Sequence, residues 1–276
     1  MSPIPRNHPS QTSQNGTASQ SLNTAFEPKM VHVAAGPFWM GSSDDHVMML
    51  VQNEDWAHEW YEDGLFRVEQ PCTQVVGKEF EIGINPVTNL EYFSFVWKTG
   101  YRVPKGWLGF KYAEGMEFLP VVNVNKKDAE AYCTWLSEMT GKKYRLPTEG
   151  EWERAASGTD GRIYPWGDTF DPWRCNTQDS GKGSPTPVGS YSPAGDSPVG
   201  AVDMAGNVYE WTSDLLLPYP YGEIPPTPPK EIKYVVRGGA WYYSHRLARC
   251  QSREGQMADH LSFAVGFRVA CSVEQS

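Results

Sequence analysis

The sequence predicts an α+β fold that is poor in regular secondary structure. Three observations support this class. The 276 residues include 26 glycines and 22 prolines, which favours turns over long helices and strands. Clear helical periodicity is confined to a few short segments before Ser157. Beyond that residue the chain predicts mainly loops and short strands.

The predicted strands are short and lie early in the chain. They cover the segments 30–33, 36–41 and 80–84. The acidic and aromatic stretch 44–63 predicts a short helix followed by a loop. A helix that follows Asn89 is expected to place Tyr92, Phe93 and Val96 on one face.

Two further helices have clear boundary signals. The first is expected to begin near Lys126 and to end at Gly141. Apolar residues recur in it at helical spacing, at Ala129, Tyr132, Cys133, Leu136 and Met139. The second is expected to open at Thr148, which forms a T-x-x-E capping box with Glu151. Trp152 and Ala155 would then face the core.

Composition limits the classes of partner. The formal net charge is -9, and no run of Lys and Arg is present, which argues against a nucleic-acid partner. No stretch approaches the apolar length of a membrane span. Residues 1–26 are polar and are expected to form a disordered tail without a signal peptide, and we therefore expect a cytoplasmic protein. A single domain is expected over 27–274, with a Pro-rich excursion at 215–233.

The five cysteines do not form a recognisable framework. They are Cys72, Cys133, Cys175, Cys250 and Cys271. Their number is odd, their spacing is wide, and none forms a CxxC pair, so a disulfide framework or a zinc site is not expected. Reduced and mostly buried thiols are the favoured interpretation.

A series of short motifs carries a resemblance to a known family. In chain order the motifs are FWMGS at 38–42, PVTN at 86–89, YRLPTEGEWE at 144–153, YPWGD at 164–168, TPVG at 186–189, GNVYEW at 206–211, RGG at 237–239 and GFR at 266–268. Their joint order resembles the formylglycine-generating-enzyme (sulfatase-modifying factor) family over roughly residues 27–271. The resemblance implies an irregular α+β fold related to C-type lectins.

The resemblance also bears on catalysis. Oxidases of this family need two cysteines near the C-terminal end, one soon after Arg-Gly-Gly and one a few residues later, and soft thiolates suit Cu(I). Here no cysteine follows Arg237 until Cys250, and Cys271 lies past the GFR motif. We therefore expect a non-catalytic member without a catalytic cofactor. The alternative is an oxidoreductase that uses copper or iron.

A structural calcium ion is a second implication of the resemblance. Family members bind Ca²⁺ with a segment that corresponds here to Asp203, Gly206, Val208 and Glu210. A second family site would involve Asn176 and the Thr177 carbonyl. The alternative is that Asp203 and Glu210 only accept hydrogen bonds within the loop, as loop carboxylates often do. From the sequence the two interpretations are equally good.

The stretch 240–265 between the last two motifs resembles the variable region of a diversity-generating retroelement target. Such retroelements randomise adenines, and an asparagine codon AAC changed in this way yields a restricted set of residues. All eight residues of two clusters belong to that set: Tyr242, Tyr243, Ser244, His260, Leu261, Ser262, Phe263 and Ala264. The resemblance implies a variable protein with a diversified binding surface and a protein ligand.

This interpretation predicts a specific arrangement of side chains. The residues expected to contact the ligand are Trp241, Tyr242, Tyr243, Ser244, His245, Leu247, Ser252, His260, Leu261, Ser262, Phe263 and Ala264. The two clusters should be exposed, because the fold must tolerate exchange there, while Trp241 and Phe267 anchor the scaffold inside. Arg237 and Arg268 should be structural and pair with carboxylates or loop carbonyls. The alternative is that Tyr242, Tyr243 and Phe263 are ordinary core aromatics.

Overall fold

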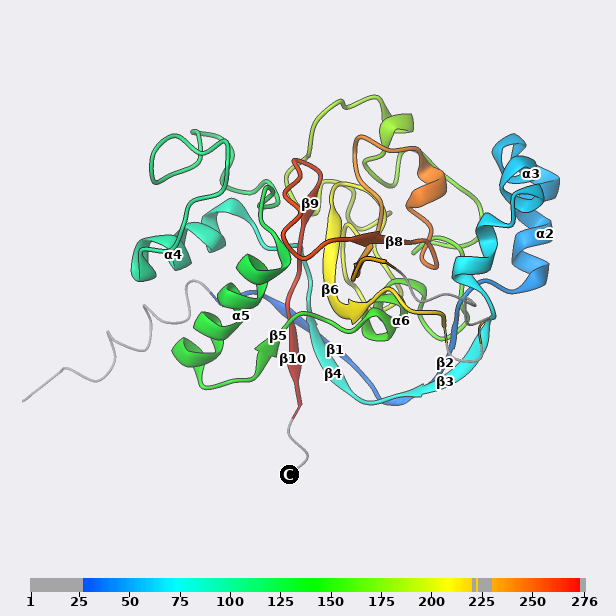
Figure 1. Cartoon of the computed structure of the whole chain (residues 1–276), viewed down its shortest axis with the longest axis horizontal. Helices are drawn as coiled ribbons and strands as arrows, with labels where there is room; N and C mark the ends of the chain where they lie inside the picture. Colours follow the sequence, from blue (N-terminus) through cyan, green and yellow to red (C-terminus); the bar gives the residue numbers. More distant parts are fainter. Residues whose placement is uncertain (1–26, 220–221, 223–229, 274–276) are drawn as a thin grey trace, which may run out of the picture.

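The computed structural model describes residues 27–219, 222 and 230–273. The predicted tail at 1–26 and the central part of the Pro-rich excursion lie outside these residues. The ends of the excursion are held together, because the Leu216 amide donates to the Lys233 carbonyl. Short strands occupy the middle of the molecule and helices lie toward both ends of its long axis (Figure 1). Among the described residues, no helix is long and apolar enough to cross a bilayer.

One sheet joins the two ends of the described chain. Its strand order is β1-β4-β10-β5, and every pair is antiparallel. The strands are β1 (Met30–Val33), β4 (Phe80–Gly83), β10 (Ala270–Ser272) and β5 (Tyr144–Arg145). The C-terminal strand therefore lies between two strands that come much earlier in the chain, β4 and β5, and this fixes the end of the chain against the rest of the fold.

A second sheet is built from the last third of the chain. Its order is β8-β7-β6-β9, with β6 and β9 parallel and the other neighbours antiparallel. The strands are β6 (Tyr209–Leu215), β7 (Tyr234–Arg237), β8 (Arg253–Gln256) and β9 (Val265–Gly266). A separate ribbon pairs β2 (Gly36–Met40) with β3 (Thr73–Gly77), and β3 was not predicted. The predicted fold class, a mixed and irregular α+β domain, is confirmed.

The helices agree with their boundary signals. They are α2 (Asp44–Asn53), α3 (Asp55–Glu62), α4 (Asn89–Thr99), α5 (Lys126–Thr140) and α6 (Glu149–Ser157). The capping box of Thr148 and Glu151 is present, and Gly141 ends α5 at a positive φ of 74°. The stretch 44–63 forms two helices rather than a helix and a loop: Ser43 caps the start of α2, and the extended residue Glu54 separates α2 from α3.

The largest apolar cluster joins α4 and α5 to the C-terminal strands. The rings of Tyr92 and Tyr132 stack at 5.7 Å, and Phe267 packs edge-on against Tyr132 at 5.4 Å. In α4 the predicted face was partly wrong: Phe95 is buried, whereas Phe93 is only half-buried. The buried positions nevertheless follow the i, i+3, i+4 spacing of a helix.

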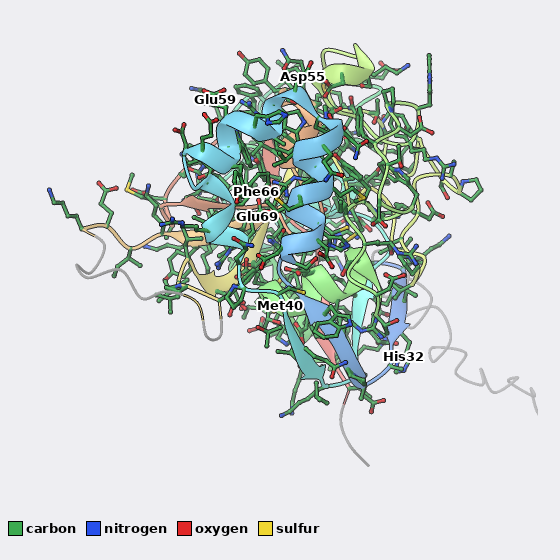
Figure 2. The ribbon with its side chains drawn as sticks, turned by 90° about the vertical axis from the view of Figure 1, so that its right-hand side faces the viewer. His32, Met40, Asp55, Glu59, Phe66 and Glu69 are labelled. Atoms are coloured by element: carbon green, nitrogen blue, oxygen red, sulfur yellow. The ribbon has the colours of Figure 1, made fainter. Side chains whose placement is uncertain are left out.

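The helices α2 and α3 form a unit at one end of the molecule, seen from outside in Figure 2. The following 3-10 helix η1 (Leu65–Glu69) contributes the buried Phe66 and the buried carboxylate of Glu69. Two more 3-10 helices, η2 (Gln178–Ser180) and η3 (His245–Leu247), lie in the long loops. These loops hold the segments on which the predicted surface depends.

Candidate functional site

Aromatic side chains from both predicted clusters meet at the surface. We call Trp241, Tyr242, Tyr243 and Phe263 the aromatic patch. The Tyr242 ring lies 5.5 Å from that of Phe263, 5.6 Å from that of Tyr243 and 5.4 Å from that of Trp241. Tyr242 and Phe263 keep 55% and 49% of their surface exposed. Two segments twenty residues apart therefore build one exposed surface, as the binding interpretation predicts.

The first half of the aromatic patch is placed by a tight turn after β7. Gly238 and Gly239 have φ values of 94° and 68°. A Cβ at Gly239 would lie 2.9 Å from the Ala248 Cα, so only glycine fits there. The Trp241 amide then donates to the Asn207 carbonyl at 3.0 Å, and the Tyr243 carbonyl accepts from the Gln178 amide at 2.9 Å.

The second half is held by the segment before α5. The Asn123 amide donates to the Ser262 carbonyl at 2.9 Å, and Lys126 donates to the Ala258 carbonyl at 3.2 Å. The Ala264 carbonyl accepts from the Tyr209 amide at 2.8 Å, which leads into the pairing of β6 with β9. These contacts use main-chain atoms, and they do not depend on which side chain stands at 261 or 263.

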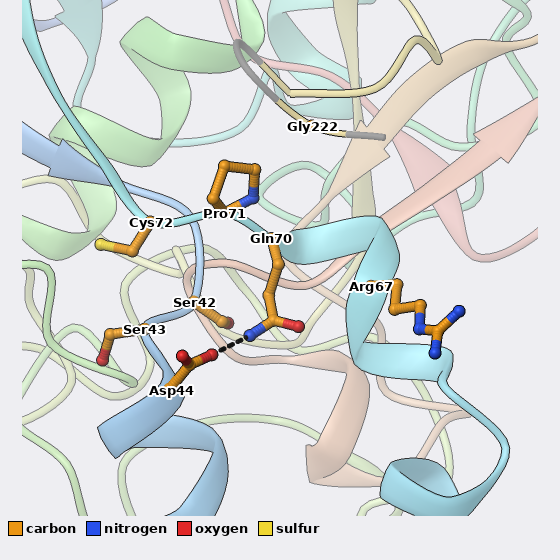
Figure 3. A pocket seen from close by; sticks show the side chains of 8 residues that line it. All are labelled: Ser42, Ser43, Asp44, Arg67, Gln70, Pro71, Cys72 and Gly222. Atoms are coloured by element: carbon orange, nitrogen blue, oxygen red, sulfur yellow. Dashed lines mark hydrogen bonds between the residues drawn. The ribbon is translucent and has the colours of Figure 1, made fainter. Parts of the chain in front are cut away.

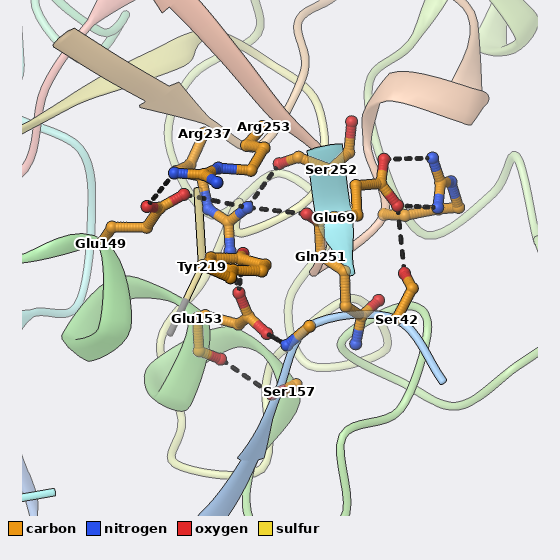
Figure 4. A network of polar contacts seen from close by, with 12 residues as sticks. Ser42, Glu69, Glu149, Glu153, Ser157, Tyr219, Arg237, Gln251, Ser252 and Arg253 are labelled. Carbon is orange, nitrogen blue, oxygen red and sulfur yellow. Dashed lines mark hydrogen bonds and ion pairs between the residues drawn. The ribbon is translucent and has the colours of Figure 1, made fainter. Parts of the chain in front are cut away.

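Four arginines of the same segment point inward. Each is buried and pairs with a glutamate from elsewhere in the fold. The pairs are Arg237 with Glu153, Arg249 with Glu69, Arg253 with Glu149, and Arg268 with Glu210. Figure 4 shows the neighbouring contacts of the first three pairs. The segment 237–268 is thus fixed from below by charge-assisted hydrogen bonds, while the side chains of the aromatic patch lie at the surface.

The contacts of Arg237 and Arg268 confirm the structural role that was predicted for these two residues. Arg237 also donates to the carbonyls of Gln251 and Ser252, at 2.8 and 2.9 Å. Arg268 donates to both carboxylate oxygens of Glu210, at 2.6 and 2.7 Å, and to the Gly83 carbonyl at 2.9 Å. Both guanidinium groups therefore tie the surface segment to distant loops.

Three of the carboxylate partners, Glu69, Glu149 and Glu153, are supporting residues that the sequence interpretation missed. Burial raises the pKa of Glu149 above its usual range, although Arg237 and Arg253 act in the opposite direction. Glu149 and Glu153 stand in the YRLPTEGEWE motif, so the motif itself was the available signal. Tyr209 was also missed: its buried ring lies 5.6 Å from that of Tyr243 and supports the aromatic patch from below.

Several residues expected at the surface are placed differently. Ser252 and Ala264 are buried, because the first lies under the Arg237 guanidinium and the second leads into β9, where its carbonyl accepts from the Tyr209 amide. These two predictions were wrong. Trp241 was expected inside but is only half-buried. Leu261 is exposed, and the remaining members are half-buried: Ser244, His245, Leu247, His260 and Ser262.

The arrangement around Glu210 does not fit a calcium ligand. Its two oxygens already accept from Arg268, and Oε2 also accepts from the Trp152 indole at 2.8 Å. A calcium ion there would face the guanidinium charge directly. Asp203 is buried and accepts from the Gly189 amide at 2.8 Å, and burial raises its pKa to about 6.

The second group of predicted calcium ligands, Asn176 and the Thr177 carbonyl, likewise makes hydrogen bonds to protein atoms. The Ser180 hydroxyl donates to the Asn176 side-chain oxygen at 3.2 Å and to the Thr177 carbonyl at 2.8 Å. The side-chain amide of Asn176 donates to the Ser184 carbonyl at 2.9 Å. Asp203, Asn176 and Thr177 therefore make loop hydrogen bonds, as the alternative describes for Asp203. Glu210 instead bonds to the distant side chains of Arg268 and Trp152.

Removal of calcium tests this arrangement. We expect that excess chelator changes the melting temperature by less than about 2 °C, because protein donors already satisfy Glu210. The measurement is a thermal melt followed by circular dichroism, with and without chelator. The control is readdition of calcium to the chelated sample. A fall of about 5 °C or more that calcium restores would contradict the expectation.

A polar hollow lies beside the start of α2, away from the aromatic patch (Figure 3). Its volume is about 490 Å³. It is lined by Ser42, Ser43, Asp44, Arg67, Gln70, Pro71, Cys72 and Gly222. The Gln70 amide donates to Asp44 at 2.8 Å, and burial raises the pKa of the Cys72 thiol. The thiol is therefore protonated and poorly suited to act as a nucleophile near neutral pH.

A family model describes this chain over almost its whole length. The model for the sulfatase-modifying factor enzyme 1-like domain matches residues 15–273. The chain belongs to this family. A mouse relative named inactive C-alpha-formylglycine-generating enzyme 2 is 30% identical over 91% of this chain and 88% of its own length. A formylglycine-generating enzyme from Streptomyces coelicolor is 40% identical over 55% of this chain and 52% of its own.

Solved structures of similar fold agree with the family assignment. PvdO from Pseudomonas aeruginosa superposes with a TM-score of 0.71 at 26% identity, over 91% of this chain and 97% of that one. Treponema denticola variable protein 1 superposes with a TM-score of 0.67 at 21% identity, over 88% and 94%. The fold of sulfatase-modifying factor domains is therefore shared by proteins with different names, and the family alone does not fix the function.

The cysteines of this family member do not come together. Cys250 is fully buried in the apolar cluster that contains Trp152, and Cys271 is buried in a different cluster with Tyr144. Burial raises the pKa of both thiols. Among the described residues, no group of three or more His, Cys, Asp or Glu side chains has a metal-binding arrangement.

Proposed function

We propose that this chain is a ligand-binding variable protein of a diversity-generating retroelement, and that its ligand is a protein. The observation that carries the proposal is the division of side chains in the segment 237–268. Four of its five arginines are buried and paired with glutamates, whereas Trp241, Tyr242, Tyr243 and Phe263 form the aromatic patch at the surface. A surface of this kind can change its side chains without loss of the fold.

The chemistry of the aromatic patch supports a protein ligand. Tyrosine and tryptophan supply large contact area at low conformational cost, and they are enriched in recognition surfaces. The indole N–H of Trp241 and the hydroxyl of Tyr209 have no hydrogen-bond partner among the described residues. A ligand that offers acceptor atoms near the patch could satisfy such groups after a small rearrangement, which would favour polar as well as apolar contacts.

A pair of libraries tests the proposal directly. The first library randomises four exposed positions, Tyr242, Tyr243, Leu261 and Phe263. The matched control library randomises four buried positions of the same segment, Cys250, Gln251, Ser252 and Ala264. We expect most members of the first library to fold, since surface substitutions usually change stability by less than about 0.5 kcal/mol each. Most members of the second should fail, because they create cavities or bury unpaired polar groups.

Selection on the first library then measures binding. Displayed members are selected for binding to a panel of immobilised folded proteins. We expect to recover specific binders of proteins that the parent sequence does not bind. The proposal fails if the exposed library folds no better than the buried one, or if its folded members yield no binders. A near-copy of the codons for residues 239–268 that differs only at adenines, beside a reverse-transcriptase gene, would be independent support.

An oxidoreductase remains the second candidate, because a relative carries the name formylglycine-generating enzyme. The thiols of Cys250 and Cys271 are buried in separate clusters, and this argues for binding without chemistry. The direct assay is incubation with a cysteine-containing peptide, Cu(I) and oxygen, followed by mass spectrometry. We expect no conversion of the peptide cysteine beyond the protein-free control.

A further inference from the structure

We propose that His245 is a positioning residue that couples the aromatic patch to the α2–α3 unit. This inference rests on the proposed function of the patch. His245 follows the first cluster of the variable stretch, and its side chain is only 13% exposed. It therefore contributes little contact surface of its own.

The His245 ring lies between two carboxylates from distant parts of the chain. Its Nε2 atom is 3.3 Å from Glu54 Oε2, and its Nδ1 atom is 3.2 Å from Asp179 Oδ2. The ring also stacks on Phe170, with centroids 4.0 Å apart and planes at 17°. Three separate segments thus hold one imidazole in a single orientation.

On one side, these contacts reach the aromatic patch through the main chain. The His245 amide donates to Asp179 at 2.7 Å, and the neighbouring Gln178 amide donates to the Tyr243 carbonyl at 2.9 Å. Two consecutive residues of η2 therefore hold Tyr243 and His245. Loss of the His245 side chain would remove the imidazole contacts to Glu54 and Asp179 from this turn.

On the other side, the contacts reach the helical unit. Glu54 separates α2 from α3, and its amide donates to the Leu50 carbonyl at 2.8 Å. The Trp56 indole donates to Glu54 at 3.1 Å and lies 3.3 Å from His245 Nε2. A substitution at His245 should therefore alter local stability at the junction of α2 and α3 as well as at the aromatic patch.

Other side chains enclose the imidazole between the two acids. They are the Trp56 indole and the Phe170 ring, and the Thr177 hydroxyl lies 3.2 Å from Asp179. The guanidinium groups of Arg246 and Arg249 lie over the nearby rings of Trp60 and Trp56. The contacts of His245 therefore involve elements from several parts of the fold.

Amide hydrogen exchange of the ligand-free protein tests the inference. In His245→Ala we expect exchange to accelerate about 10-fold in both partner segments, 50–58 and 176–180, as well as in 241–247. His260 is half-buried in the second cluster, and its substitution is the matched control for loss of a histidine side chain. His260→Ala should leave exchange in those three segments within about 2-fold of the wild type.

A conservative variant separates positioning from simple packing. Glu54→Gln keeps the shape of the side chain and removes the charge that faces His245, so exchange in 241–247 should accelerate in it as well. If His245→Ala unfolds the protein, Glu54→Gln still provides the test.

The inference is overturned if exchange in 50–58 and 176–180 is unchanged in a folded His245→Ala protein, or if exchange in 241–247 is unchanged in Glu54→Gln. No ligand is used, so these outcomes are independent of the library selection. Accelerated exchange without any binders would leave the coupling intact and reject the proposed function. Binders without accelerated exchange would support the proposed function and reject the coupling through His245.

Discussion

Replacement of Arg268 by methionine is expected to lower the free energy of unfolding by about 3–5 kcal/mol, because it leaves the Glu210 carboxylate buried without its partner. Arg268 and Glu210 are both fully or almost fully buried, and the guanidinium also satisfies carbonyls of Gly83 and Val202. Urea denaturation at pH 7, followed by tryptophan fluorescence, measures the change.

A surface pair provides the control for Arg268. Arg162 and Asp160 form an ion pair with side chains that are 30% and 56% exposed. Arg162→Met should cost less than about 1 kcal/mol, because water and salt screen exposed charges. Similar losses of unfolding free energy in Arg268→Met and Arg162→Met would mean that the buried ion pair does not stabilise the segment 237–268. The double variant Glu210→Gln with Arg268→Met should be more stable than the sum of the single changes predicts.

Two phenylalanines four residues apart are expected to respond very differently to truncation. Phe267→Ala should destabilise the protein by about 3–5 kcal/mol, since it opens a cavity in a close-packed core. Phe267 has no exposed surface and contacts the rings of Tyr92 and Tyr132. Phe263→Ala removes a ring that is half-exposed in the aromatic patch, and the cost should stay below about 1 kcal/mol.

The same pair distinguishes scaffold from surface. The free energies of unfolding of both variants are compared with the wild type under one set of conditions. A large loss of stability in Phe263→Ala would mean that Phe263 is a core aromatic residue, and it would weaken the binding proposal. A small loss in Phe267→Ala would show that the core collapses around the missing ring.

Local sequence signals predicted the elements that depend on local interactions. The capping box of Thr148 and Glu151 marked the start of α6, and Gly141 marked the end of α5, because caps and left-handed glycines act within one turn. The β3 strand was missed, since its pairing with β2 joins segments far apart in the chain. The face of α4 was only partly right because its neighbour α5 lies elsewhere in the sequence.

The sequence by itself determined the family, through the order of its motifs, and it determined which two clusters of residues were candidates for exchange. Tertiary structure alone decided which members of those clusters face the solvent. Ala264 is buried and Phe263 beside it is half-exposed, because the chain turns into β9 there and pairs with β6.

Tertiary structure also decided the roles of the charged residues. Nothing local distinguishes Arg249 or Arg253 from a surface arginine, and their glutamate partners lie more than a hundred residues away along the chain. His245 belonged to the exposed set by its position in the sequence, yet Glu54 and Asp179 enclose it. Burial and pairing depend on segments that meet only after folding, and the pattern of neighbouring residues does not encode them.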